Sequence, residues 1–147
     1  MRKKFVNEQF TKSKEYKETL KIIEKTGKCP FCKENFKYHK KPILKEEKNW
    51  FLTENSWPYK NTQYHFLIIS KRHKENFNQL DYFDFKSVSK LVNWTIKKYQ
   101  IKGGGLTLRF GAPIYTSSSV CHLHFHLIVP RIDKKNKKAR IVNFPIG

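Results

Sequence analysis

Two spacings of hydrophobic positions run along this chain of 147 residues. A three-to-four spacing over 13–25, with Ser13 as its cap, predicts a helix whose apolar side carries Tyr16, Leu20, Ile22 and Ile23. The same spacing over 80–99 predicts a longer helix that ends before three consecutive glycines. Shorter β-rich apolar runs predict strands at 50–53, 64–70, 106–110 and 122–129, and an edge strand at 141–144.

The connections between these elements decide the fold class. Apart from residues 71–105, the connections between neighbouring strands are too short to contain crossover helices. We therefore expect an α+β fold with an antiparallel sheet of about five strands and two main helices. Residues 39–48 are interpreted as a charged loop and 134–138 as a basic turn. Residues 1–12 are predicted to form a flexible basic arm, and 13–147 a single domain.

Composition narrows the class of protein. Hydrophobic residues make up 38% and aromatic residues 15% of the chain, which excludes a fully disordered protein. No apolar run approaches the roughly 20 residues that a membrane span needs. No apolar stretch follows the basic N-terminus, so no secretory signal is visible. We therefore expect a cytoplasmic protein that does not bind membranes.

The net charge is unusually high, because 31 Lys and Arg residues face only 12 Asp and Glu, which gives +19. Such a surface attracts polyanions, including nucleotides and nucleic acid. A second interpretation is equally open: the lysines are spread along the whole chain, as in a generally lysine-rich composition. Nonspecific binding of nucleic acid through the basic surface is thus one of two readings.

Three histidines alternate with apolar residues in the segment His122-Leu123-His124-Phe125-His126. Successive strand side chains point to opposite faces, so the three imidazoles share one face. Burying them together for structure alone would be costly, which favours function. Imidazole serves as metal ligand, acid, base or nucleophile. The small and hydroxylated turn at 111–119, just upstream, favours chemistry at phosphorus, since such turns bring N–H groups to phosphate oxygens.

A second motif, Cys29-Pro30-Phe31-Cys32, spaces two thiols as in metal knuckles and in redox pairs. Three cysteines are too few for a disulfide scaffold, and no thioredoxin-like strand precedes the pair. A redox pair is therefore less favoured, while a metal knuckle and two buried thiols both stay open at this point. Cys121 is expected to face the core or a dimer interface.

The histidine pattern resembles the signature of the histidine triad superfamily of nucleotide hydrolases and transferases. The resemblance covers roughly residues 29–131. It includes the paired cysteines of zinc-binding members, and it closes on Val129-Pro130-Arg131. The segments Asn55-Ser56-Trp57-Pro58-Tyr59, His65-Phe66-Leu67-Ile68-Ile69 and Lys71-Arg72-His73 are also similar to the superfamily's order of motifs.

The resemblance implies a role for each matching residue. His124 would attack the α-phosphate and form a nucleotidyl-histidine intermediate, His126 would donate a hydrogen bond to phosphate or to the leaving group, and His65 would pack against the triad. The branch that transfers nucleotides to sugar phosphates has Gln where His126 stands, so the histidine favours hydrolysis by water. Substrate-binding positions implied in the same way are Asn55, Trp57, Arg109, Ser117 and Ser119.

The resemblance also implies a structural zinc ion and a homodimer. The ligand set would be Cys29, Cys32, His73 and His122, which makes a closed tetrahedral site. The chain departs from its relatives at Tyr64, where glycine is usual, and in a serine-rich phosphate turn.

The predicted function is therefore a nucleotide hydrolase or transferase acting on dinucleoside polyphosphates or nucleoside phosphoramidates. Two alternatives stay open. One is a hydrolase of 5′-adenylates on nucleic acid, and the other is a non-catalytic zinc-knuckle protein that binds nucleotides or nucleic acid.

Overall fold

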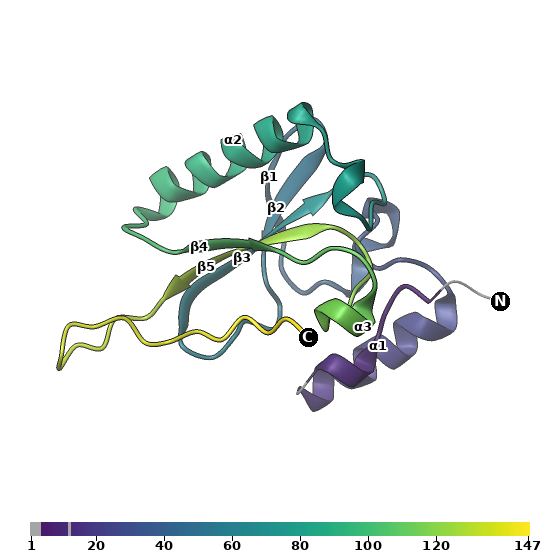
Figure 1. The fold of residues 1–147 in the computed structure, drawn as a ribbon, viewed down its shortest axis with the longest axis horizontal. Helices are drawn as coiled ribbons and strands as arrows, with labels where there is room; N and C mark the ends of the chain where they lie inside the picture. The colour runs from purple at the N-terminus through teal and green to yellow at the C-terminus, as the bar shows by residue number, and fades with distance from the viewer. Residues whose placement is uncertain (1–3, 12) are drawn as a thin grey trace.

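The computed structural model describes residues 4–11 and 13–147. Five strands form one antiparallel sheet in the order β1-β2-β3-β5-β4 (Figure 1). The strands are β1 (Ile43–Glu46), β2 (Trp50–Glu54), β3 (Thr62–Ser70), β4 (Gly105–Leu108) and β5 (His124–Pro130). The helices are α1 (Lys14–Thr26), α2 (Tyr82–Tyr99) and the single turn α3 (Pro113–Thr116), with 3-10 turns at Glu8–Phe10, Lys33–Tyr38 and Phe77–Gln79. The predicted α+β class and antiparallel sheet are confirmed.

Local sequence signals fix the ends of both long helices. The Ser13 hydroxyl accepts from the amide of Tyr16 at the start of α1, and Gly27 ends it with a φ of 66° that suits glycine. Asp81 caps α2, which moves its start from the predicted residue 80 to residue 82. The prediction that Ile22 lies on the apolar side of α1 is wrong: its side chain is 55% exposed, while Leu20 and Ile23 are buried.

The sheet has two different faces. One face packs against α2 in the main core, to which β5 contributes Phe125 and Leu127 and the residue just before it contributes Leu123. On the other face, His124 pairs with Ile69 and His126 pairs with Leu67 across β3. His122 precedes β5, so only two of the three imidazoles belong to the strand. Within β5, the predicted alternation of imidazole and apolar side chains is confirmed. It places the second and third histidines on the face turned away from α2.

Two predicted segments differ from the structure. The charged loop at 39–48 contains β1, because Lys45 and Glu46 pair with Leu52 and Phe51 of β2. The predicted edge strand at 141–144 is not a strand, because side chains rather than a neighbouring strand bind its backbone. Asn61 donates to the Ile141 carbonyl, and Arg109 donates to the next carbonyl beyond the segment, that of Pro145.

The N-terminal segment lies beside the approach to β5. Val6 is buried and forms an antiparallel bridge with Val120, with the Asn7 amide donating to the Ser119 carbonyl. Residues 1–3 and 12 of the predicted arm lie outside the described residues. Across 4–11 and 13–147, no helix has both the length and the apolar character of a membrane span.

Candidate active site and metal cluster

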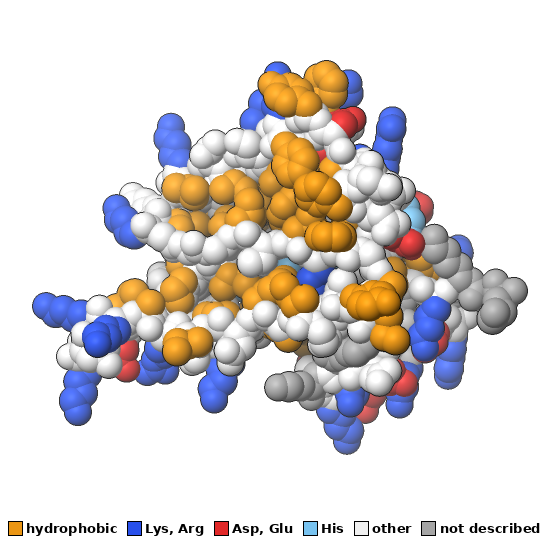
Figure 2. Space-filling view, viewed as in Figure 1, with side chains coloured by type: hydrophobic (Ala, Val, Ile, Leu, Met, Phe, Trp, Pro, Cys, Tyr) orange, Lys and Arg blue, Asp and Glu red, His pale blue; other side chains and the backbone are white. Residues whose placement is uncertain are grey.

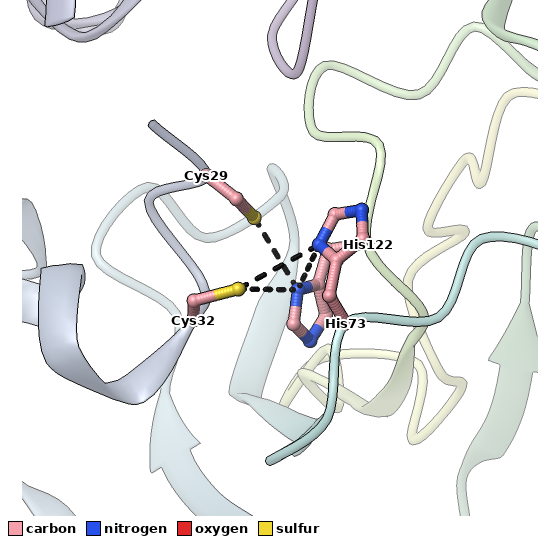
Figure 3. A group of neighbouring side chains, drawn as sticks. All are labelled: Cys29, Cys32, His73 and His122. Atoms are coloured by element: carbon pink, nitrogen blue, oxygen red, sulfur yellow. Dashed lines mark hydrogen bonds between the residues drawn. The ribbon is translucent and has the colours of Figure 1, made fainter. Parts of the chain in front are cut away.

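Four side chains from three separate segments converge at the start of β5. Cys29 and Cys32 come from the turn after α1, His73 from the loop after β3, and His122 from the residues that lead into β5. Figure 3 shows the two thiols and two imidazoles pointing toward one centre. Their ligand atoms all lie within 4.8 Å of one another. The structure thus brings together the four residues of the predicted metal site.

The distances in this cluster fit a tetrahedral ion. With metal–sulfur bonds of about 2.3 Å and metal–nitrogen bonds of about 2.05 Å, tetrahedral angles separate two nitrogens by about 3.3 Å and a sulfur from a nitrogen by about 3.6 Å. The two Nδ1 atoms lie 3.2 Å apart. The Cys29 sulfur lies 3.3 Å from Nδ1 of His122, and the Cys32 sulfur lies 3.6 Å from Nδ1 of His73. The residues present therefore fit a zinc-sized cation.

Hydrogen bonds outside the cluster select the ring nitrogens that face it. Nε2 of His122 donates to the Ser70 carbonyl at 2.6 Å, which leaves Nδ1 with a free lone pair. Nε2 of His73 lies 2.8 Å from a carboxylate oxygen of Glu75, which does the same for that ring. Burial raises the pKa of Cys29 to about 12 and raises that of Cys32, so thiolates there need a cation.

The loop after β3 also positions the strand. The amide of Leu123 donates to the Lys74 carbonyl at 2.6 Å, and the Leu123 carbonyl accepts from Ser70. Lys74 is itself tied to the buried carboxylate of Asp84 in α2, at 2.5 Å. These bonds hold Leu123 on both sides, so its neighbours His122 and His124 have fixed places.

His124 presents a bare nitrogen. Its Nδ1 donates to the backbone carbonyl of His122 at 2.6 Å, so Nε2 carries the lone pair. Burial lowers the pKa of His124 to about 4; the bond to His122 opposes this shift, and the nearby charge of Arg109 adds to it. The ring is therefore neutral near pH 7, and Phe31 contacts it edge-on at a centroid distance of 4.9 Å.

His126 presents the opposite: an N–H. The Tyr59 amide donates to Nδ1 of His65 at 3.1 Å, so the proton of His65 sits on Nε2. That Nε2 lies 2.8 Å from Nδ1 of His126 and donates to it. The proton of His126 is thereby placed on Nε2, which is buried and has no partner among the described residues. An orphaned buried N–H is costly, which indicates a ligand atom there.

Both imidazoles line a cavity of about 820 Å³, a volume suited to a small-molecule ligand. Residues from both ends of the described chain line this cavity, from Thr11 at one end to Pro145 at the other. The lining includes the predicted substrate residues Asn55, Trp57, Arg109, Ser117 and Ser119. His122 is absent from this lining, because its ring is turned into the metal cluster.

Protein groups contact the two serines and the tryptophan in this cavity. The Ser119 hydroxyl lies 2.9 Å from the hydroxyl of Tyr16, and the Ser117 hydroxyl donates to the Gly147 carbonyl. The Trp57 ring stacks on Tyr16 at 4.3 Å, and its buried Nε1–H has no partner among the described residues. Asn55 accepts from the Trp57 amide and lies beside His65.

Sequence reasoning missed several cavity residues. Tyr59 orders the tautomers of His65 and His126, and its position directly after Pro58 in a motif already singled out was the available signal. Tyr16 was assigned only to the apolar side of a helix. His39, which was given no role, lines the cavity and contacts Thr53 through Nε2. Phe144, which was expected in a strand, lies outside the cavity lining but contacts the ring of His126 at a centroid distance of 5.1 Å.

Comparison with known families now bears on this geometry. Residues 28–142 match the family described as "Scavenger mRNA decapping enzyme C-term binding". The chain belongs to this family, and so to the histidine triad superfamily. The predicted superfamily is confirmed, and the family's description, which names a decapping enzyme, agrees with the predicted enzyme class.

Solved structures of the same fold agree with this membership. The histidine triad nucleotide-binding protein from Candida albicans matches with a TM-score of 0.60 at 20% identity, over 80% of this chain and 83% of its own. A HIT family hydrolase from Clostridium thermocellum matches at 0.53 and 24% identity, over 72% and 92%. A zinc-bound histidine triad family protein from Mycobacterium smegmatis matches at 0.53 and 17% identity, over 75% and 79%. Among curated proteins, no relative matches.

Proposed function

We propose that this histidine triad protein is a nucleotide hydrolase that cleaves at the α-phosphate through a covalent intermediate on His124. The observation that carries the proposal is the pair of complementary tautomers. Nε2 of His124 carries a lone pair, and Nε2 of His126 carries a proton. Both rings line one cavity. A nucleophile and a hydrogen-bond donor side by side are what displacement at phosphorus requires.

The reaction then follows in two displacements. The Nε2 lone pair of His124 attacks the α-phosphorus, and the bond from phosphorus to the leaving group breaks with its electron pair on the leaving group. The N–H of His126 stabilises charge on a phosphate or leaving-group oxygen. Water next attacks phosphorus, loses a proton to solvent, and returns the electron pair to His124. A histidine at position 126, in place of glutamine, favours water as the acceptor.

The substrates proposed are dinucleoside polyphosphates and nucleoside phosphoramidates. Supporting groups are the apolar and aromatic cavity wall, which includes Phe31 and Trp57, and the cation of Arg109 close to both histidines. The roles of Asn55, Ser117 and Ser119 in holding ribose and phosphate are part of the same proposal.

We also propose that the four-residue cluster binds a structural zinc ion. Cys29, Cys32, His73 and His122 would hold it with all four positions filled by protein. Bound there, zinc would cross-link the turn after α1, the loop after β3 and the entry to β5. It would act on the reaction only by fixing where β5 begins.

The test is direct capture of the intermediate. Wild-type protein mixed with a diadenosine polyphosphate and quenched in base should carry AMP on the peptide containing His124, and should release AMP over time. His124→Ala should do neither while still binding AMP. Equal AMP release by the two proteins would overturn the assignment, and binding of AMP without turnover by wild type would favour the non-catalytic reading.

One observation favours substrates attached to nucleic acid as a second candidate. The hairpin of residues 131–140 carries six Lys and Arg against the single acid Asp133, and the chain runs from it directly to cavity residues Ile141, Asn143 and Pro145. Basic side chains of this hairpin project at the lower left of Figure 2. If a 5′-adenylated oligonucleotide is the substrate, its affinity should fall steeply with salt. Replacing Lys134, Lys135, Lys137 and Lys138 by Gln should weaken binding of the oligonucleotide but leave binding of a diadenosine polyphosphate unchanged.

A homodimer is the proposed assembly. β4 is the last strand of the sheet, and an aromatic cluster of exposed side chains lies near it. Phe77 contacts Phe85 and Phe110 at centroid distances of 6.1 and 5.5 Å, and each is at least 43% exposed. Figure 2 shows hydrophobic side chains gathered on this side of the molecule. Sedimentation equilibrium should report a dimer, and Phe110→Glu should yield monomer.

A further inference from the structure

Among the residues that the structure describes, one arginine lines the cavity, and it is held by contacts from the last residues of the chain. Arg109 follows β4, and its Nε–H donates to the Pro145 carbonyl at 2.8 Å. Its Nη2 donates to the hydroxyl of Tyr59 at 2.9 Å. The central guanidinium carbon lies 3.9 Å from the centroid of the Phe144 ring. Phe144 and Pro145 lie beyond residue 142, where the match to the family ends.

These contacts restrain the guanidinium on three sides. An arginine side chain has several rotatable bonds, and a single hydrogen bond would leave its charge free to swing. A ring face fixes the guanidinium plane by cation–π attraction, while the carbonyl and the phenol fix its direction within that plane. Phe144 is therefore the contact that sets the tilt of the guanidinium plane.

The same residues also surround the proposed hydrogen-bond donor. The Phe144 ring lies 5.1 Å from the ring of His126 and 6.1 Å from that of Tyr59. The Tyr59 ring stacks near His126 at 5.8 Å. The Phe144 ring thus contacts both the Arg109 cation and the ring of His126. Displacing Phe144 would therefore change the position of the cation relative to the N–H of His126.

The charge of Arg109 reaches the reacting groups. Together with burial, the main cause, it lowers the pKa values of His65, His124 and His126. During attack on phosphorus, negative charge builds up on the phosphate oxygens. A cation held at a fixed place stabilises that charge without having to reorganise during the reaction.

We propose that Phe144 is a positioning residue for this reaction, because its ring face holds the Arg109 guanidinium where phosphate charge develops. The proposal rests on the proposed function for its effect on rate. It extends the working site beyond the family's matched residues to Phe144 and Pro145.

A double-mutant cycle tests it. Phe144→Leu should lower kcat for a diadenosine polyphosphate about 10-fold, the size of a partly desolvated cation–π contact, with a smaller change in KM. Arg109→Ala should cost about 100-fold. Phe144→Leu made in the Arg109→Ala background should cost nothing further, because the group it positions is gone. Phe144→Tyr keeps the ring face and should restore most of the rate.

Controls separate positioning from structure. Ile146→Ala, in the same segment at a side chain that is 70% exposed and does not line the cavity, should leave kcat unchanged. All variants should melt within a few degrees of wild type. A loss from Phe144→Leu that is equal in the two backgrounds would overturn the role of Phe144 and leave the proposed function intact.

Affinity for AMP, measured by calorimetry, makes the test independent of turnover. Phe144→Leu should lower the affinity for AMP several-fold in the wild-type background but should not change it in the Arg109→Ala background. If wild type binds AMP but turns nothing over, the proposed function fails while this binding cycle still decides the role of Phe144. If wild type does not bind AMP, both proposals are wrong.

Discussion

His122 and His124 lie two residues apart, and each gives one ring nitrogen to a backbone carbonyl at 2.6 Å, yet they end in different chemistry. His122 donates from Nε2 to Ser70, and its Nδ1 faces two thiols. His124 donates from Nδ1 to His122, and its Nε2 is left for the cavity. The same side chain thus becomes a proposed metal ligand in one place and a proposed nucleophile in the other, because a different carbonyl selects a different tautomer.

The two regions also differ in how completely they are closed. The cluster around His122 directs every ligand atom at another ligand atom, so nothing is left for a substrate. The region around His124 and His126 leaves a buried N–H without a partner beside an open cavity. A closed set of polar atoms stabilises a fold, whereas an unsatisfied one is kept for a ligand.

The largest effect should come from His124 itself. His124→Ala should lower kcat by about 10⁴-fold, because the nucleophile is lost and only the donors that stabilise the transition state remain. Zinc content by elemental analysis should not change. A variant that loses both zinc and activity would show that the two regions are not separable.

Removing the cluster should act on stability first. Cys29→Ala with Cys32→Ala should abolish metal binding and cost about 3 kcal/mol or more, a fall in Tm of about 10 °C for a chain of this size. Chelating the metal from wild-type protein should lower Tm by a similar amount, and adding zinc back should restore the original Tm. The control is Cys121→Ala, outside the cluster, which should keep about one zinc per chain. Full thermal stability in carefully metal-free protein would refute the structural role.

The donor should matter less than the nucleophile. His126→Gln should lower kcat about 100-fold with little change in KM, because a hydrogen bond made mainly in the transition state is weakened. The side-chain amide still presents an N–H, so residual hydrolysis is expected. A change confined to KM would mean that His126 binds the ground state only.

The effect that is smallest near pH 7, and that grows only in acid, comes from His65. Burial lowers the folded-state pKa of His65 to about 3, below its ordinary value of about 6.5, so the unfolded chain binds the extra proton first. The stabilisation from neutral His65 is complete above about pH 6.5 and is lost as the pH falls toward 3, by at most about 1.4 kcal/mol per pH unit. Denaturant melts from pH 7 to 4 should show a shallower decline for His65→Gln than for wild type. If the stability of both proteins fell equally with pH, His65 would not contribute to the loss of stability in acid.

Much of the fold could be predicted because its signals are local. The cap at Ser13, the glycine after α1 and the alternation through β5 each act within a few residues. The ends of the sheet could not be predicted in this way. β1 lies in a charged run and exists because β2 pairs with it, while 141–144 is apolar enough for a strand but binds side chains instead.

The candidate site divides along the same line. The amino-acid sequence by itself determined which residue types are available and that His124 and His126 share one face, because strand geometry imposes a period of two. It also paired Cys29 with Cys32, which lie within one turn. Only the tertiary structure decided which nitrogen of each ring carries the lone pair, that Tyr16 and Tyr59 line the cavity, and that Phe144 packs against His126. Those outcomes depend on carbonyls, amides and rings from distant segments, and no local pattern encodes where such groups arrive.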